Sequence, residues 1–139
     1  MKKYKITLLV SVVAAIIIEA LPFGAVCNFA TPEKTITQTF SYFSLIPYGY
    51  ANFGPFLTAV STCILFIFAI ILFTPKAKKI ITAAAVISGF SLFTSVLPLI
   101  MFGGSCFNLV SVFISLLMLL QFVVIMIIKS KKEVIQSEA

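Results

Sequence analysis

The sequence contains no histidine, aspartate, arginine or tryptophan, and only 10% of its residues are charged. A single acid, Glu19, lies inside its long apolar runs, so the chain lacks the grouped side chains that acid–base catalysis or metal binding needs. We therefore expect no enzymatic activity, no metal site and no cofactor. Arginine makes the bidentate contacts with phosphate and guanine that many nucleic-acid-binding proteins use. Its absence argues against a nucleic-acid partner, although the net charge is +6.

Apolar residues are abundant instead: they make up 61% of the 139 residues and give a mean hydropathy of +1.19. A helix needs about 20 apolar residues to cross the hydrocarbon core of a bilayer. Runs of that length lie at about Ile6–Val26, Phe53–Thr74, Ile80–Phe102 and Phe107–Ile128. The sequence predicts an all-α fold, a four-helix transmembrane bundle that forms a single integral membrane domain over residues 1–139.

Lysines supply all of the positive side-chain charge, and they lie beside the apolar runs rather than inside them. Three precede the first run, three separate the second from the third, and three follow the fourth: Lys2, Lys3, Lys5, Lys76, Lys78, Lys79, Lys129, Lys131 and Lys132. Lysine accumulates in cytoplasmic loops. The pattern predicts a multi-pass protein of the plasma membrane with both termini in the cytoplasm and only Lys34 outside. The cytoplasmic lysines are expected to attract anionic lipid headgroups.

A secretory signal peptide is the alternative interpretation of the N-terminus. MKKYK followed by ITLLVSVVAAIII has the basic start and the apolar core of such a segment. The stretch LPFGAVC also resembles a lipoprotein cleavage box. However, Val26 precedes Cys27 at the position where such a box requires a small residue, and no A-x-A site is present. We expect the first run to be retained as a span.

The segment between the first two runs, residues 28–51, is the one sizeable loop and is expected on the outer side. Residues 35–42 alternate with period two, which predicts a β-like segment. Aromatic side chains collect at membrane interfaces. We predict an outer aromatic cap that either covers the helix ends or offers a platform for a lipid, another apolar ligand or a partner protein. Its residues are Phe40, Tyr42, Phe43, Tyr48 and Tyr50.

The block FSYFSLIPYGYANFGPFLT, which runs from this loop into the second apolar run, resembles small, uncharacterised four-span integral membrane proteins of low-GC bacteria. The dominance of isoleucine and lysine and the absence of arginine fit that resemblance. It implies a bacterial plasma membrane and carries no activity with it.

Small and hydroxylated residues recur at helical spacing in every apolar run, and transmembrane helices pack through such stripes. We predict that these stripes point inward. They are Ser11, Ala15 and Glu19 in the first run; Thr58, Thr62, Leu65 and Ala69 in the second; Ala84, Ser88, Ser91 and Ser95 in the third; Ser111 and Ser115 in the fourth.

Several polar side chains fall at one depth when the runs are built as helices with a rise of about 1.5 Å per residue. We predict a hydrated polar layer in the outer third of the bundle, formed by Glu19, Ser61, Thr62, Thr94, Ser95 and Ser115. Pro22 and Pro98 each free a backbone carbonyl near this depth. Two interpretations of Glu19 stay open: a protonated side chain that hydrogen-bonds between helices, and a functional intramembrane acid.

Two of the three cysteines, Cys27 and Cys106, are predicted at the outer ends of the first and fourth runs. They can form a disulfide there if their Cα atoms come within about 7 Å. Cys63 lies inside the second run and is expected to be a packing residue. The C-x-x-C pairs of four-span thiol oxidoreductases are absent, which argues against redox catalysis.

Two functions are consistent with these features. The first is a binding or accessory protein for a lipid or a membrane partner, which includes the case of a homodimer. The alternative is a small proton-linked transporter that uses Glu19, as small multidrug exporters use a glutamate in the first of their four spans. The substitution Glu19→Gln separates them, because a transporter would lose its activity while an accessory protein would keep its fold and partner.

Overall fold

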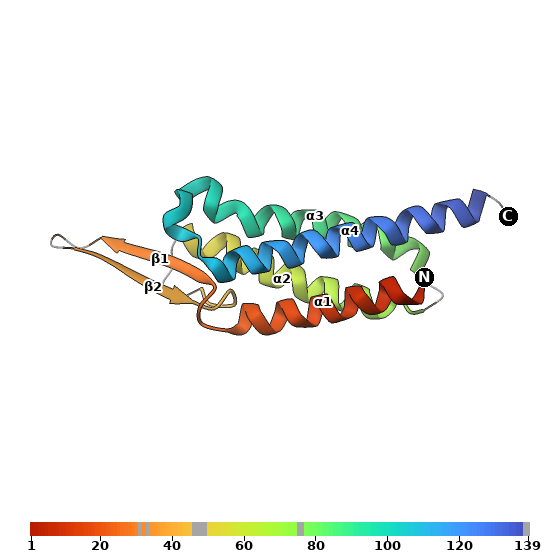
Figure 1. Cartoon of the computed structure of the whole chain (residues 1–139), viewed down its shortest axis with the longest axis horizontal. Coiled ribbons are helices and arrows are strands. Elements are labelled where there is room, and N and C mark those ends of the chain that lie inside the picture. The colour runs from red at the N-terminus through yellow and green to blue at the C-terminus, as the bar shows by residue number, and fades with distance from the viewer. Residues whose placement is uncertain (31, 33, 46–49, 75–76, 138–139) are drawn as a thin grey trace.

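A computed structural model describes residues 1–30, 32, 34–45, 50–74 and 77–137; for 50–51, 77–79 and 132–137 it describes the backbone alone. The described part of the chain is mostly helical and adds a small two-stranded sheet to the all-α fold expected from the sequence. Figure 1 shows the helices lying side by side. The hairpin projects beyond one end of the helices, and both termini lie at the opposite end.

Helix α1 (Lys2–Ala20) ends six residues before the expected boundary at Val26. Pro22 accounts for the difference, because a proline disfavours helical backbone at the residue before it. Leu21 is accordingly extended, with φ −71° and ψ 143°. The chain then turns into strand β1 (Ala25–Ala30), so Val26 belongs to the sheet rather than to a span.

Strand β2 (Thr35–Phe40) confirms the β-like segment that the alternation of residues 35–42 predicted. It pairs with β1 as an antiparallel hairpin in which Ala25 lies opposite Phe40 and Ala30 opposite Thr35. The strand β1 was not predicted, because its sequence AVCNFA reads as a continuation of the first apolar run.

The other helices are α2 (Tyr50–Ile71), α3 (Ala77–Phe102) and α4 (Leu109–Ser137), with a short 3₁₀ turn, η1 (Gly103–Cys106), between α3 and α4. Helix α4 continues past Ile128, where the apolar run ends. The side chain of Asn108 caps α4, since its Oδ1 accepts the backbone N–H of Ser111 at 2.9 Å.

Three helical segments in the described part of the chain are long and apolar enough to cross a membrane: Asn52–Ile71, Ile80–Cys106 and Leu109–Lys131. Helix α1 is not among them, because its 19 residues include three lysines near its start and Glu19 near its end. It nevertheless packs against α2 and α4, and α3 also packs against both of those helices.

The helical region buries polar side chains together with apolar ones, and its outside is apolar. The predicted inward stripes are confirmed: every stripe residue is buried except Ser115, which is half-buried. Large apolar side chains cover the outside, as for Val86 (67% exposed) and Phe113 (56% exposed). This is the reverse of a soluble protein, and it fits a surrounding of lipid, which leaves polar groups no outside partner.

Candidate functional site

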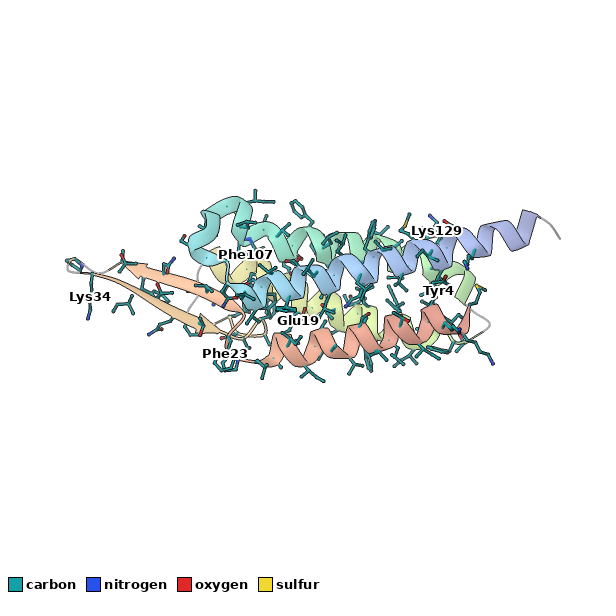
Figure 2. The ribbon with its side chains drawn as sticks, in the orientation of Figure 1. Tyr4, Glu19, Phe23, Lys34, Phe107 and Lys129 are labelled. Carbon is teal, nitrogen blue, oxygen red and sulfur yellow. The ribbon has the colours of Figure 1, made fainter. Side chains whose placement is uncertain are left out.

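Glu19 is fully buried near the hairpin end of α1, at 0% exposure. Figure 2 shows its side chain between the helices, far from Tyr4 and Lys129 at the end that carries the termini. Its Oε1 accepts a hydrogen bond from the Thr62 hydroxyl of α2 at 2.9 Å. Its Oε2 has no hydrogen-bond partner among the described residues. The structure thus brings together two of the residues predicted to share a polar layer.

A second contact extends this layer from α2 to α3. The hydroxyls of Thr58 and Thr94 lie 2.9 Å apart, and the Thr62 hydroxyl also lies 2.9 Å from the Thr58 carbonyl oxygen. Thr58 was predicted to face inward but was not assigned to the layer. It connects Thr62 with Thr94, so a path of hydrogen-bonding groups runs from α1 through α2 to α3.

Ser95 and Ser115 form a separate contact between α3 and α4. The Ser115 hydroxyl donates to the backbone carbonyl of Ser95 at 3.4 Å, while the Ser95 hydroxyl bonds within its own helix to Leu92. Ser61 is buried, at 3% exposure. The six predicted residues are therefore all inside the helical region. Glu19, Thr62 and Thr94 belong to one path of contacts, Ser95 and Ser115 form another contact, and Ser61 belongs to neither.

Met118 of α4 lies between the helices and was not predicted as a site residue. Its sulfur accepts a hydrogen bond from the Ser91 hydroxyl at 2.9 Å and lies 3.8 Å from the Thr62 hydroxyl. An apolar residue in an apolar run gives no sequence signal for such a contact.

Gln121 is a second buried polar residue that the sequence interpretation left out. It is 0% exposed, and its Nε2 donates to the backbone carbonyl of Ser11 at 3.3 Å, which links α4 to α1. Its Oε1 has no partner among the described residues. The sequence does mark Gln121 as a candidate for burial between helices, because it is the one side-chain amide between Leu109 and Ile128.

Tyr42 closes the hairpin end of this region. The Tyr42 side chain is 1% exposed, and its backbone N–H donates to the Glu19 carbonyl oxygen at 2.9 Å. Its hydroxyl bonds to Ser111, whose own hydroxyl donates to the Gly24 carbonyl at 2.8 Å. Burial raises the pKa of the Tyr42 phenol, and the bond to Ser111 opposes that shift. Glu19 is thus buried beneath Tyr42, whereas the sequence predicted a hydrated layer around it.

Two grooves among the described residues lie away from Glu19. One of about 400 Å³ runs along the seam between α1 and α4, where Val10, Ser11 and Leu117 contribute to its lining. Another of about 370 Å³ lies farther along α4, beside Phe122 and Lys131. Neither is lined by Glu19.

The three residues of the predicted aromatic cap whose side chains are described differ in their exposure. Tyr42 is a core residue, Phe40 is half-buried against the same cluster, and Phe43 is 38% exposed. Tyr48 and the side chain of Tyr50 lie outside the described residues. Tyr42 therefore covers the helix ends, and it is not one of the interfacial rings that the sequence analysis expected.

The hairpin presents the most exposed polar surface at this end of the molecule. Strand β2 is exposed at each residue from Thr35 to Thr39, whereas β1 is buried from Ala25 to Cys27. The inner strand β1 packs against α2 and η1. Figure 2 places Lys34 at the far tip of the hairpin, beyond Phe23 and Phe107 at its base.

The three cysteines are free thiols in the structure. Cys27 donates to the Asn52 Oδ1 at 2.9 Å, and Cys106 ends η1 nearby. Among the described residues, no group of three or more histidine, cysteine, aspartate or glutamate side chains could hold a metal ion.

Comparison of the chain with protein-family models, with curated proteins and with solved structures finds no match to any of them.

Proposed function

We propose that this chain is a small multi-pass protein of a bacterial plasma membrane that binds a partner protein on the outer side, as an accessory subunit. In this proposal α1 is a fourth span, and the helices form a transmembrane four-helix bundle. At about 1.5 Å per residue, the 19 residues of α1 reach about 28 Å. That length is close to the roughly 30 Å of a hydrocarbon core.

The arrangement of charge supports both termini in the cytoplasm. Lys2, Lys3 and Lys5 belong to the first turns of α1, and Lys129 and Lys131 to the late turns of α4. These segments lie together at the end opposite the hairpin (Figure 1). The side chains of Lys76, Lys78, Lys79 and Lys132 lie outside the described residues. Basic residues on one side predict that side to be cytoplasmic and in contact with anionic headgroups.

The observation that carries the binding role is the open edge of β2. Its backbone pairs with β1 on one side, and the sheet has no third strand in the described part of the chain. The strand sequence TITQTF has no charge and no proline, two features with which proteins often block an exposed edge. Such an edge accepts an extended peptide as an additional strand.

The same edge favours a polypeptide partner over a lipid or a second copy. The hairpin projects past the helix ends, away from the region where acyl chains would lie (Figure 1). A second copy inserted with the same orientation would present a β2 that runs in the same direction. The two edges would then meet as parallel strands, which is the less stable pairing. An extended segment of another protein has no such restriction.

A proton-linked transporter remains the second candidate, because one observation favours it. The Glu19 Oε2 is buried and has no partner among the described residues, which is costly in a low-dielectric interior unless water or a transported ion binds there. The burial of Glu19 beside Tyr42 favours the accessory role, since Glu19 is 0% exposed and the described residues leave it no contact with the outside.

Site-specific photo-crosslinking tests the binding role. A photoreactive residue at Thr35 is compared with one at Phe113, which faces outward on α4. In native membranes we expect a protein adduct of one mass from Thr35 and lipid adducts from Phe113. The adduct should disappear when Thr37→Lys puts a charge on the edge strand. Lipid adducts alone at Thr35, or an adduct of twice the chain mass in vesicles that contain only this chain, would contradict the proposal.

Glu19→Gln separates the two candidates. The amide keeps the shape of the side chain and its bond from Thr62, but it cannot carry a proton across the membrane. The accessory role predicts that the Thr35 adduct persists. Proton uptake by vesicles that is present with Glu19 and lost with Gln would establish the transporter instead.

A further inference from the structure

Cys27 and Cys106 lie in neighbouring segments at the base of the hairpin, although they are far apart in the chain. Cys27 is 5% exposed in β1, and Cys106 is 7% exposed at the end of η1. Strand β1 packs directly against η1. The Asn28 amide donates to the Ser105 carbonyl at 3.1 Å and to the Cys106 sulfur at 3.6 Å. These contacts hold the two short segments together, and Cys106 is close enough to Cys27 to affect its pKa.

The two thiols differ in their surroundings. Cys27 is held by its hydrogen bond to Asn52. Burial, and to a smaller extent negative charge on Cys106, raises the pKa of the Cys27 thiol, so Cys27 stays protonated at neutral pH. Cys106 is buried but directly follows an exposed stretch from Met101 to Ser105, so a small local opening of η1 would expose its sulfur to a reagent.

We propose that Cys27 and Cys106 are the site of a reversible disulfide that ties the hairpin to the connection between α3 and α4. The co-reactant is another disulfide, either that of a protein oxidant or that of oxidised glutathione. The proposed topology puts both thiols on the outer side, where such oxidants act. The cross-link itself does not depend on the proposed binding role.

The chemistry follows ordinary thiol–disulfide exchange. The Cys106 thiolate attacks one sulfur of the oxidant, whose sulfur–sulfur bond breaks and releases one thiolate. Cys27 then loses its proton, leaves Asn52 and attacks the Cys106 sulfur of the mixed disulfide, which releases the second thiolate. The two cysteines lose two electrons, and the oxidant takes them up as two thiols. A reducing thiol reverses both steps.

The cross-link fixes the hairpin at its base. The bond would prevent β1 from separating from η1. Residues 27–106, which include α2 and α3, would then form a closed covalent loop. Asn52, near the start of α2, would lose its bond from the Cys27 thiol. Cys63 lies half-buried inside α2 and takes no part.

The test uses the full chain in lipid nanodiscs with Cys63→Ser, so that two thiols remain. The protein is exposed to oxidised glutathione, denatured, and reacted with a maleimide-linked polymer that adds one mass step per free thiol. We expect two steps before oxidation, none after it, and two again after reduction. Mass spectrometry of the peptides should show residues 27 and 106 joined within one chain. Oxidation should accelerate as the pH rises, because Cys27 must lose its proton.

Single variants identify the order of attack and keep the test decisive. With Cys27→Ser we expect a stable glutathione adduct on Cys106, and with Cys106→Ser we expect Cys27 to react far more slowly. Two free thiols after oxidation of the folded protein, or disulfides only between separate chains, would overturn the proposal. Restoring Cys63 provides one further check, since a bond from Cys63 to either cysteine would also overturn it.

Discussion

The half of the helical region near the termini and the half near the hairpin are held together differently. The terminal half has an apolar cluster, with Leu8, Leu65 and Ile125 among its buried residues. The hairpin half has a smaller apolar cluster that surrounds the contacts of Glu19 and Thr58. Lipid is as apolar as leucine, so apolar packing joins helices through van der Waals contact alone, whereas hydrogen bonds also fix which faces meet. The hairpin half has more of these hydrogen bonds and therefore specifies more of the arrangement. In the terminal half, the Gln121–Ser11 bond adds to apolar packing.

Leu65→Ala should have the largest effect, because it empties part of the terminal cluster. Leu65 is 1% exposed, and such truncations in protein cores cost about 2–5 kcal/mol. Ile67→Ala on the same helix is the matched control, since Ile67 is 56% exposed and lipid can refill its place. The free energy of unfolding in mixed micelles, followed by circular dichroism during titration with denaturing detergent, measures both. Equal losses for the two variants would show that the terminal half is not closely packed.

Gly24→Ala should have the next largest effect and should destabilise the hairpin half. A Cβ at Gly24 would lie 2.8 Å from two ring carbons of Tyr42, which is buried and cannot retreat into solvent. Overpacking of this kind costs about 1–3 kcal/mol. Gly104→Ala is the control, because its added Cβ meets nothing within 4 Å. We expect a lower thermal midpoint and a weaker near-ultraviolet tyrosine signal for the first variant only; unchanged values for both would contradict the closure by Tyr42.

Thr62→Val should have the smallest effect, since it keeps the shape of the side chain and removes one hydrogen bond to Glu19. Bonds between transmembrane helices contribute about 0.6 kcal/mol on average and up to about 2 kcal/mol. A double-mutant cycle with Glu19→Gln isolates the coupling between the two side chains. Thr82→Val on α3 is the control, because Thr82 is exposed. Independent, additive effects of the Thr62 and Glu19 substitutions would show that the bond contributes nothing.

Most helices and inward faces could be predicted from the sequence, because the membrane imposes simple rules. A long apolar run must hide its backbone in a helix, and its few hydroxyls must avoid lipid. Those two requirements located α2, α3, α4 and the buried stripes. The period-two alternation of residues 35–42 likewise located β2.

The remaining features depend on which surfaces meet, and a single sequence does not contain that information. The strand β1 is apolar at its start because it packs against α2, and the same apolarity made it read as part of a span. The aromatic ring of Tyr42 fills a core position, whereas its residue type suggested a place at the membrane interface. The contact between Thr58 and Thr94 requires the relative rotation of α2 and α3, which spacing along one helix does not give.

The length of the hairpin sets how far its tip reaches from the surface of the membrane. Each strand has six residues, so at about 3.3 Å per residue the hairpin extends about 20 Å. The headgroup layer on each side of a bilayer is only about 5–8 Å thick. Because Ala25–Cys27 of β1 are buried beside α2 and η1, about half of this length projects past the helix ends, so the tip near Lys34 reaches about the outer limit of the headgroups. A protein that adds a strand to β2 therefore has to reach it at the level of the headgroups.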